Sequence, residues 1–220
     1  MSDSHLKALY PFLEKSAAEP VALDAALVDS VLAKARDSRE ANERFFAAQA
    51  PALIGAARCI ALAYRREGRI LVMGNGGSSC DAAHVAVEFQ HPVTAGRPAL
   101  TAINLTADIA MISAVANDVG FEHVFVRQVV AHGRRGDVLV GLSTSGNSAN
   151  LLAAFAKARE LGIATIGLAG GDGGRMRSSG LVEHLLVVPS DSIHRVQETH
   201  VTAYHILWDL VHAVLSNEVR

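Results

Sequence analysis

Hydrophobic and polar positions follow two different rhythms along the chain, and the change falls near residue 66. Before it, apolar residues recur at helical spacing; after it, short apolar runs alternate with amphipathic stretches. The expected strands cover residues 70–73, 100–104, 138–142, 164–168 and 185–188, and the expected helices cover 78–90, 108–116, 121–132, 147–161 and 196–218. This alternation predicts a doubly wound α/β fold with a mostly parallel, five-stranded sheet covered on both faces.

The region before the sheet, residues 1–66, predicts helices alone. These expected helices are Ser4–Lys15, Leu23–Ala35, and a helix or helix pair from about Ser38 to Arg66. Pro51 lies inside the last of them, where it should force a start or a kink. The apolar stripe of this Ala-rich region is wider than an isolated helix can leave in water. We therefore expect residues 1–66 to serve oligomerisation and residues 67–220 to form the α/β domain.

Composition and charge narrow the classes of protein. Half of the 220 residues are apolar, which supports a substantial core, and the net charge of −2 predicts neither a nucleic acid nor an anionic membrane as partner. The two cysteines, Cys59 and Cys80, predict free thiols in a reducing cytosol. The N-terminus lacks a cationic region followed by an apolar run, and no run of about 18 apolar residues appears. We expect a cytoplasmic protein without a membrane span.

Two loops rich in glycine and serine directly follow expected strands. The first is Gly74–Ser79, and the second is Gly141–Ser148, which carries four hydroxyl groups. Strand ends of an open α/β sheet face the ligand crevice, where backbone N–H groups and hydroxyls can surround a phosphate. Neither loop matches a nucleotide fingerprint, because Ser79 replaces the third glycine and Asn147 replaces the lysine of a P-loop. The alternative is a pair of tight turns with Ser148 as an N-cap, but two such loops favour a phosphate.

His84 and Glu88 are the first candidates for proton transfer. They stand four residues apart, on one face of the helix that follows the first loop. Such a pair on a helix surface contributes only about 0.2–0.5 kcal/mol. The neighbouring residues, however, make this helix apolar nearly all round, and a buried polar pair needs partners.

The C-terminal helix offers those partners. At 100° per residue, His205 lies roughly 20° from Glu198, roughly 80° from Gln197 and roughly 140° from His200. His200 and His205 therefore do not belong to one site, and spacing favours Glu198 as the companion of His205. Periodicity leaves open whether Gln197 or Glu198 points into the cleft. Ten histidines also make chance spacings common, so a structural role remains the alternative.

Taken together, these motifs resemble the SIS (sugar isomerase) family and, within it, the sedoheptulose 7-phosphate isomerases. The matching segments are Gly74–Ser78, Asp81–Glu88, Asn117–Phe121, Gly136–Leu139, Ser143–Ser148, Gly170–Gly174 and Gln197–His205. They occur in the family's order and with similar spacing over roughly residues 40 to 215. The resemblance implies a flavodoxin-like SIS domain that binds a phosphorylated sugar in residues 67–220.

The resemblance also implies roles for individual residues. Glu88 and His205 match the catalytic pair that moves protons between C1 and C2 of the sugar. The implied substrate-binding residues are Asn75, Gly76, Ser78, Asp118, Ser143, Thr144, Ser145, Ser148 and Gln197. In some relatives the residues matching His84, Glu88, Gln197 and His205 bind zinc, which favours Gln197 over Glu198, although glutamine is an unusual zinc ligand. The resemblance also implies a homotetramer with its sites near the subunit interfaces. We expect no nucleotide cofactor.

Two positions depart from the family's pattern. Pro92 stands where an arginine is common, and His194 stands where an acidic residue can occur. The implied reaction is isomerisation of sedoheptulose 7-phosphate to D-glycero-D-manno-heptose 7-phosphate through an enediol. The departures leave open an isomerase of another phosphosugar. A non-catalytic scaffold that resembles the replication-initiator-associating protein of bacteria is a further alternative, but that branch lacks a glutamate at the position of Glu88.

Overall fold

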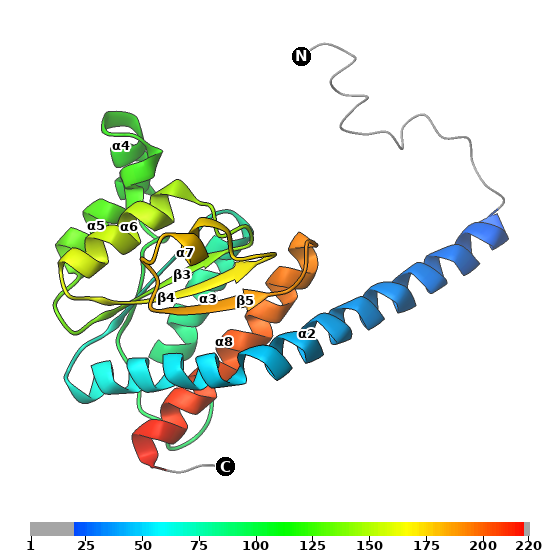
Figure 1. Ribbon diagram of the computed structural model, residues 1–220, viewed down its shortest axis with the longest axis horizontal. Coiled ribbons are helices and arrows are strands. Elements are labelled where there is room, and N and C mark those ends of the chain that lie inside the picture. The colour runs from blue at the N-terminus through cyan, green and yellow to red at the C-terminus, as the bar shows by residue number, and fades with distance from the viewer. Residues whose placement is uncertain (1–19, 218–220) are drawn as a thin grey trace. The chain divides into compact units, whose positions relative to one another are not determined.

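The computed structural model describes residues 20–217, so the expected helix Ser4–Lys15 lies outside the described residues. The elements are α2 (Pro20–Arg65), β1 (Ile70–Gly74), α3 (Gly77–Gln90), β2 (Ala102–Asn104), α4 (Ile109–Asp118), η2 (Phe121–His123), α5 (Val124–His132), β3 (Val138–Ser143), α6 (Ala149–Glu160), β4 (Ala164–Gly170), α7 (Gly174–Ser178), β5 (His184–Val188) and α8 (Ile193–Ser216) (Figure 1). Each expected strand is present, within two residues at either end.

The five strands form one sheet in the order β2-β1-β3-β4-β5, and every neighbouring pair is parallel. This is the flavodoxin-like order, so the predicted doubly wound fold is confirmed. The strand order reverses between β1 and β3, where Ile70 is paired with Val138. Ligands of such sheets bind at the carboxyl ends of the strands beside this reversal. Both glycine–serine loops begin there, because they follow β1 and β3.

The buried strands send alternate side chains into two cores. Ile70 and Val72 face the core that α3, α8 and the second half of α2 cover, whereas Leu71 and Met73 face the core beneath α5 and α6 (Figure 1). All four side chains have an exposed fraction of 0%. Because strands buried on both faces need apolar residues at every position, they read as continuous hydrophobic runs. That property made them visible in the sequence.

Helix α2 runs from Pro20 to Arg65 and contains Pro51, so the start expected at this proline is wrong. Pro51 is exposed, and the positions after it pack into the core through Leu53 and Ile60, which are 3% and 0% exposed. This packing compensates for the backbone hydrogen bond that a proline cannot donate. Among the described residues, Asp24–Arg65 is long and apolar enough to cross a membrane by length and composition, with 33% of its most apolar window buried. Core helices of soluble proteins meet the same criterion, and Leu53 and Ile60 of this helix are buried in the core.

The chain divides into two compact units, residues 1–37 and residues 38–220. In the first unit, one stretch of α2 exposes half or more of four large apolar side chains. They are Leu27, Val28, Val31 and Leu32. The boundary expected near residue 66 and the oligomerisation role stay predictions.

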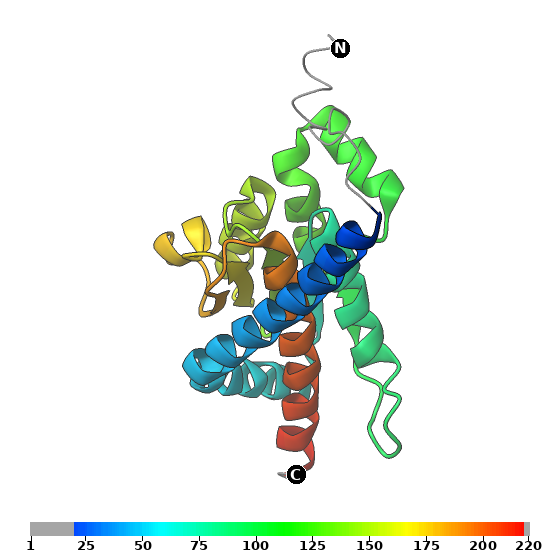
Figure 2. The ribbon, with the colours of Figure 1, turned by 90° about the vertical axis from the view of Figure 1, so that its right-hand side faces the viewer.

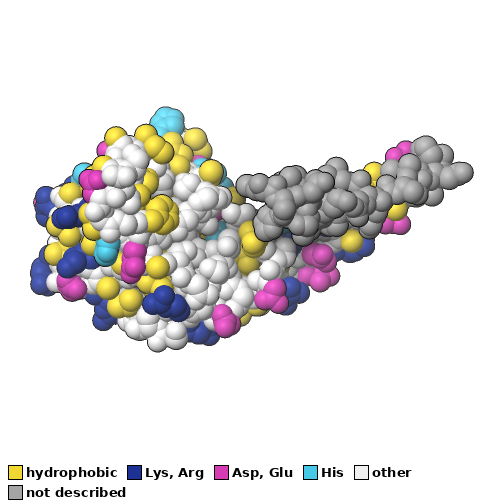
Figure 3. Space-filling model, turned by 90° about the horizontal axis from the view of Figure 1, so that it is seen from above, with side chains coloured by type: hydrophobic (Ala, Val, Ile, Leu, Met, Phe, Trp, Pro, Cys, Tyr) yellow, Lys and Arg dark blue, Asp and Glu magenta, His cyan; other side chains and the backbone are white. Residues whose placement is uncertain are grey.

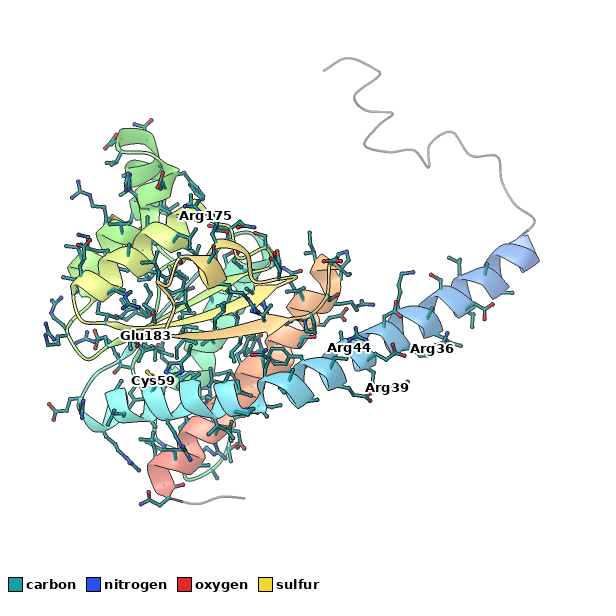
Figure 4. All side chains as sticks on the ribbon, viewed as in Figure 1. Arg36, Arg39, Arg44, Cys59, Arg175 and Glu183 are labelled. Atoms are coloured by element: carbon teal, nitrogen blue, oxygen red, sulfur yellow. The ribbon has the colours of Figure 1, made fainter. Side chains whose placement is uncertain are left out.

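Both cysteines of the chain are free, as expected. Burial raises the pKa of the Cys59 thiol, and the Glu183 carboxylate raises it further (both labelled in Figure 4). Cys59 is therefore held in its protonated, unreactive form. On the face drawn in Figure 3, acidic and basic side chains are interspersed rather than gathered by sign.

Candidate active site

The loop between β1 and α3 makes a sharp turn that only glycine permits at its first position. A Cβ on Gly74 would lie 2.2 Å from the carbonyl oxygen of Ser78, and Gly76 has a φ of +54°. This turn starts α3 at the carboxyl edge of the sheet and buries Ser78, which is 4% exposed. The predicted strand–turn–helix is therefore present, with the exposed backbone of Gly76 at its apex.

Asn75, predicted to bind the sugar, is paired within the protein. Its amide exchanges two hydrogen bonds of 2.9 Å each with the amide of Asn150, on the first turn of α6. These bonds tie the first loop to the helix that follows the second loop. Asn75 therefore fixes the distance between the two loops, in addition to its predicted contact with the sugar.

In the second loop, the first residues Gly141 and Leu142 belong to β3, and residues Ser143–Ser148 arrange their hydroxyls around the start of α6. The Oγ atoms of Ser143 and Ser148 lie 3.1 Å apart, and the N–H of Gly146 donates to Ser143 Oγ at 3.2 Å. Ser148 holds the N-cap position of α6, as the alternative interpretation expected, but its side chain makes no capping bond to the described helix. The Leu151 N–H donates to Asn150 Oδ1 at 3.0 Å, so the N–H groups of Ala149 and Asn150 are the ones that can meet an anion, together with the more exposed hydroxyls of Thr144 and Ser145.

A cleft of about 470 Å³ opens beside this loop. Its walls come from the loops after three neighbouring strands and include Thr144, Ser145, Asp172, Ser190 and Asp191. The loop after β4 touches the second loop closely, since a Cβ on Gly146 would lie 2.2 Å from the carbonyl oxygen of Gly173. The Arg175 N–H, at the start of α7 (Figure 4), donates to Asn147 Oδ1 at 2.9 Å. The carboxyl edge of the sheet thus holds a polar cleft beside a serine-rich loop.

Helices α3 and α8 lie side by side and run in the same direction (Figure 2). A residue of α3 faces the residue of α8 that follows it by 120 positions. Tyr204 Oη lies 2.7 Å from His84 Nδ1, and Trp208 Nε1 donates to the Glu88 carbonyl oxygen at 2.8 Å. The same offset sets Gln197 against Gly77. This register decides which polar groups of the two helices meet.

His84, Glu88 and His205 meet between these helices, and we call them the triad. One donor atom from each lies within 4.8 Å of the other two. His84 Nε2 is 3.2 Å from Glu88 Oε1, and the rings of His84 and His205 are 4.9 Å apart between centroids. The structure therefore brings His205 beside the pair on α3. Two imidazole nitrogens and one carboxylate oxygen match the donor set of three-ligand zinc sites, so these residues fit a metal ion.

Gln197 and Glu198 point elsewhere. A Cβ on Gly77 would lie 2.2 Å from Gln197 Nε2, which sets the Gln197 amide against the first turn of α3. Eight residues of helix, or about 12 Å, separate Gln197 from His205 along α8. Glu198, which spacing favoured, accepts a bond of 2.6 Å from Arg195. Desolvation raises the pKa of Glu198, but hydrogen bonds with Ser38 and Arg195 outweigh it, so the net shift is downward.

Two other candidate residues also lie apart from the triad. Asp118 is exposed at the end of α4, where Asn117 donates to its carboxylate at 2.8 Å. His200 is fully buried, and its Nε2 lies 3.2 Å from the carbonyl oxygen of Ala169. Burial lowers the pKa of His200 to about 4, although the bond to Ala169 acts in the opposite direction. The separation of His200 from His205 follows the helical angles read from the sequence.

Sequence reasoning missed Tyr204 and Trp208, which contact the triad from α8. The available signal was weak, because aromatic residues at helical spacing usually belong to a core. Arg97 reaches the same place from the loop after α3: its guanidinium lies 4.6 Å over the Trp208 ring and 2.5 Å from Asp209 Oδ1. Arg97 therefore braces Trp208, which in turn holds the backbone of Glu88. Pro92 lies in the same loop, partly buried.

Comparison with known proteins gives one consistent result. The SIS domain family matches residues 35–170. A phosphoheptose isomerase of Desulfovibrio desulfuricans is 47% identical over 89% of this chain and 92% of its own length. Among solved structures, a phosphoheptose isomerase from Francisella tularensis has a TM-score of 0.80 at 35% identity, covering 84% of this chain and 97% of that one. One from Neisseria gonorrhoeae has a TM-score of 0.78 at 38% identity, covering 84% and 98%.

Proposed function

Because the chain belongs to the SIS domain family and, within it, to the phosphoheptose isomerases, we propose that it interconverts sedoheptulose 7-phosphate and D-glycero-D-manno-heptose 7-phosphate, with Glu88 and His205 as the proton-transfer pair. The observation that carries the assignment of residues is the triad, which sets a carboxylate and an imidazole within 4.8 Å of each other. The protein is a soluble isomerase that acts on a phosphorylated sugar. Its free cysteines support a cytoplasmic location.

The chemistry requires a base and an acid on adjacent atoms. Converting a ketose to an aldose means removing a proton from the carbon beside the carbonyl, protonating the carbonyl oxygen, and reversing these roles through an enediol. We assign the carbon-bound proton to Glu88 and the oxygen-bound proton to His205. His84 Nε2, at 3.2 Å, holds the Glu88 carboxylate in place, and the side chain of Glu88 is only 19% exposed. Partial exclusion of water strengthens these interactions.

The phosphate contributes binding energy away from the reacting carbons. The second loop supplies hydroxyls and the N-terminus of α6, without a fixed lysine or arginine in the loop itself. Energy released there can orient the reacting end of a flexible sugar. Ser78, in the first turn of α3, is an auxiliary contact to the same anion.

A homo-oligomer, for which we propose a tetramer, would complete the site. Gln197 lies about 12 Å along α8 from His205, too far for both to hold one group comfortably in a single chain. We therefore place Gln197 of a neighbouring copy beside the triad. The exposed apolar residues of α2, among them Leu27 and Val31, support an assembly of copies.

Zinc is our proposal for the metal, held by His84, Glu88 and His205 with Gln197 as the fourth ligand. When bound, such an ion polarises a carbonyl and stabilises negative charge on its oxygen. The described residues supply the remaining functions without it: Glu88 and His205 carry protons, and the second loop binds phosphate.

The test is a turnover assay with sedoheptulose 7-phosphate and a panel of other ketose phosphates. Glu88→Gln should lose at least about 10²-fold in rate, because the amide cannot accept the proton. Glu122→Gln, at an exposed position in η2, serves as a matched control and should keep full activity. Full activity of Glu88→Gln would remove Glu88 from the mechanism. Preference for another ketose phosphate would support the reading that Pro92 and His194 motivate.

A further inference from the structure

Tyr204 makes a contact that the proton-transfer pair does not require. Its hydroxyl lies 2.7 Å from His84 Nδ1, while the other ring nitrogen of His84 faces Glu88 at 3.2 Å. The Tyr204 ring is almost fully buried, at 3% exposure, and meets the His84 ring edge to face at 5.3 Å. It also lies 4.9 Å from the ring of His205. Tyr204 thus touches both histidines of the triad.

The hydrogen-bonding capacity of imidazole determines what this contact does. A neutral imidazole carries a proton on one nitrogen and a lone pair on the other. A phenol O–H can donate a hydrogen bond, and the Tyr204 hydroxyl lies within hydrogen-bonding distance of His84 Nδ1. With no cation present, Tyr204 O–H donates to Nδ1, and His84 Nε2–H donates to the Glu88 carboxylate. One chain of donors then runs from Tyr204 through His84 to Glu88.

We propose that Tyr204 is a positioning residue that holds the His84 ring so that Nε2 faces Glu88 and His205. When Nε2 instead binds a cation, Nδ1 carries the proton and donates to the Tyr204 oxygen. The same contact then holds the His84 ring in the same orientation. An outer partner of this kind orients a metal-binding histidine and raises its affinity for the ion. The catalytic consequence rests on the proposed function, whereas the orientation of His84 does not.

The simpler interpretation is that Tyr204 is a core residue and that His84 merely satisfies its buried hydroxyl. The two interpretations differ in what removing the hydroxyl changes. If Tyr204 only fills space, a phenylalanine does the same, and His84 stays in place through Glu88. If Tyr204 aims the ring, the loss of one oxygen atom changes His84 while the packing stays intact.

Tyr204→Phe tests this with ¹⁵N-histidine NMR of the full-length protein, with the His84 resonances assigned from His84→Gln. In the metal-free wild type we expect a protonated Nε2 and an Nδ1 that accepts a hydrogen bond. In Tyr204→Phe the Nδ1 resonance should move toward that of an imidazole nitrogen without a partner. Zinc affinity, measured by titration with zinc chloride, should fall about 10-fold or more. The matched control is Tyr64→Phe, which removes a hydroxyl that donates to the Thr101 carbonyl oxygen at 3.0 Å.

The outcomes separate this proposal from the proposed function. In the isomerase assay, Tyr204→Phe should lower kcat about 10-fold with little change in KM. A wild type without turnover of any sugar phosphate would end the proposed function, yet the NMR and zinc results would still decide the role of Tyr204. An unchanged Nδ1 resonance, or a zinc affinity within twofold of the wild type or of Tyr64→Phe, would overturn it. If Tyr204→Phe does not fold, a wild-type Nδ1 that is protonated or unbonded in the metal-free protein overturns it instead.

Discussion

The fully buried His200 should make the protein less stable in acid. Its Nε2 donates to the Ala169 carbonyl oxygen on β4, and its Nδ1 finds no hydrogen-bond partner among residues 20–217. Protonating the ring would place a charge and a second donor in this apolar position. Burial therefore lowers the pKa of His200 from 6.5 to about 4.

The sign and size of the effect follow from proton linkage. Between pH 6.5 and pH 4 the unfolded chain binds a proton at this histidine and the folded protein does not, so stability falls as the pH falls. With a folded pKa of about 4 and an unfolded pKa of 6.5, acidification from pH 7 to pH 5 lowers the free energy of unfolding by about 2 kcal/mol. This loss is a substantial share of the total stability of a typical domain.

Urea unfolding at pH 7, 6 and 5 measures it, with the protein concentration held constant. His200→Gln keeps an N–H donor for Ala169 but removes the titrating ring, so its stability should depend less on pH by about 2 kcal/mol over this range. His132→Gln, at the exposed end of α5, should follow the wild type. The change in the free energy of unfolding with pH is compared rather than its value at one pH. The substitution itself lowers the free energy of unfolding at every pH. Parallel curves for the wild type and His200→Gln would refute the reasoning.

Two other predictions concern the assembly of the site and the edge of the sheet. The Glu88→Gln and Gln197→Ala variants should each be inactive. If neighbouring copies share sites, mixing the two variants after mild denaturation should restore activity, because some sites then combine an intact Glu88 from one copy with an intact Gln197 from another. A mixture that stays inactive contradicts the sharing of sites. Asp137, which is 2% exposed, accepts bonds from the backbone N–H groups of Arg69 at 3.0 Å and Arg134 at 2.8 Å. Asp137→Ala leaves both donors without this acceptor and should lower the free energy of unfolding by about 3 kcal/mol, measured by urea unfolding; a loss below about 1 kcal/mol would show that water replaces the carboxylate.

The sequence predicted the sheet well because the strands are largely apolar runs, and four of the five, all but β5, end at glycine, serine or asparagine. Strands β1 and β3 are parallel neighbours in the sheet. The two glycine–serine loops that follow them therefore lie at the same edge, as expected from the sequence. Helix α2 was harder to predict. Pro51 is a helix breaker by local chemistry, and only the packing of Leu53 and Ile60 against the sheet shows why the helix continues.

The triad was only partly predictable. Spacing identified His84 and Glu88 as a pair, because residues four apart share a helix face. The sequence did not determine the rotation of α8 about its own axis. Gln197 and Glu198 are adjacent in the chain, and the helical period alone allows either of them to face α3. The 120-residue offset between α3 and α8 fixes that rotation, and it is a property of tertiary packing. Tyr204 could not be recognised before that offset was known.

Helix α3 links the two chemical parts of the proposed site. Its first turn reaches the carboxyl edge of the sheet with Ser78, whereas Glu88 lies ten residues later, about 15 Å along the helix. The proposed phosphate contact and the proposed proton-transfer residue therefore lie at opposite ends of α3 in one chain. If a neighbouring copy supplies Gln197 to the triad, as we propose, phosphate binding and isomerisation depend on the assembly to different extents. Dissociated subunits should then keep phosphate binding at the second loop and lose isomerisation, because the loop needs only its own sheet whereas proton transfer needs a correctly placed sugar.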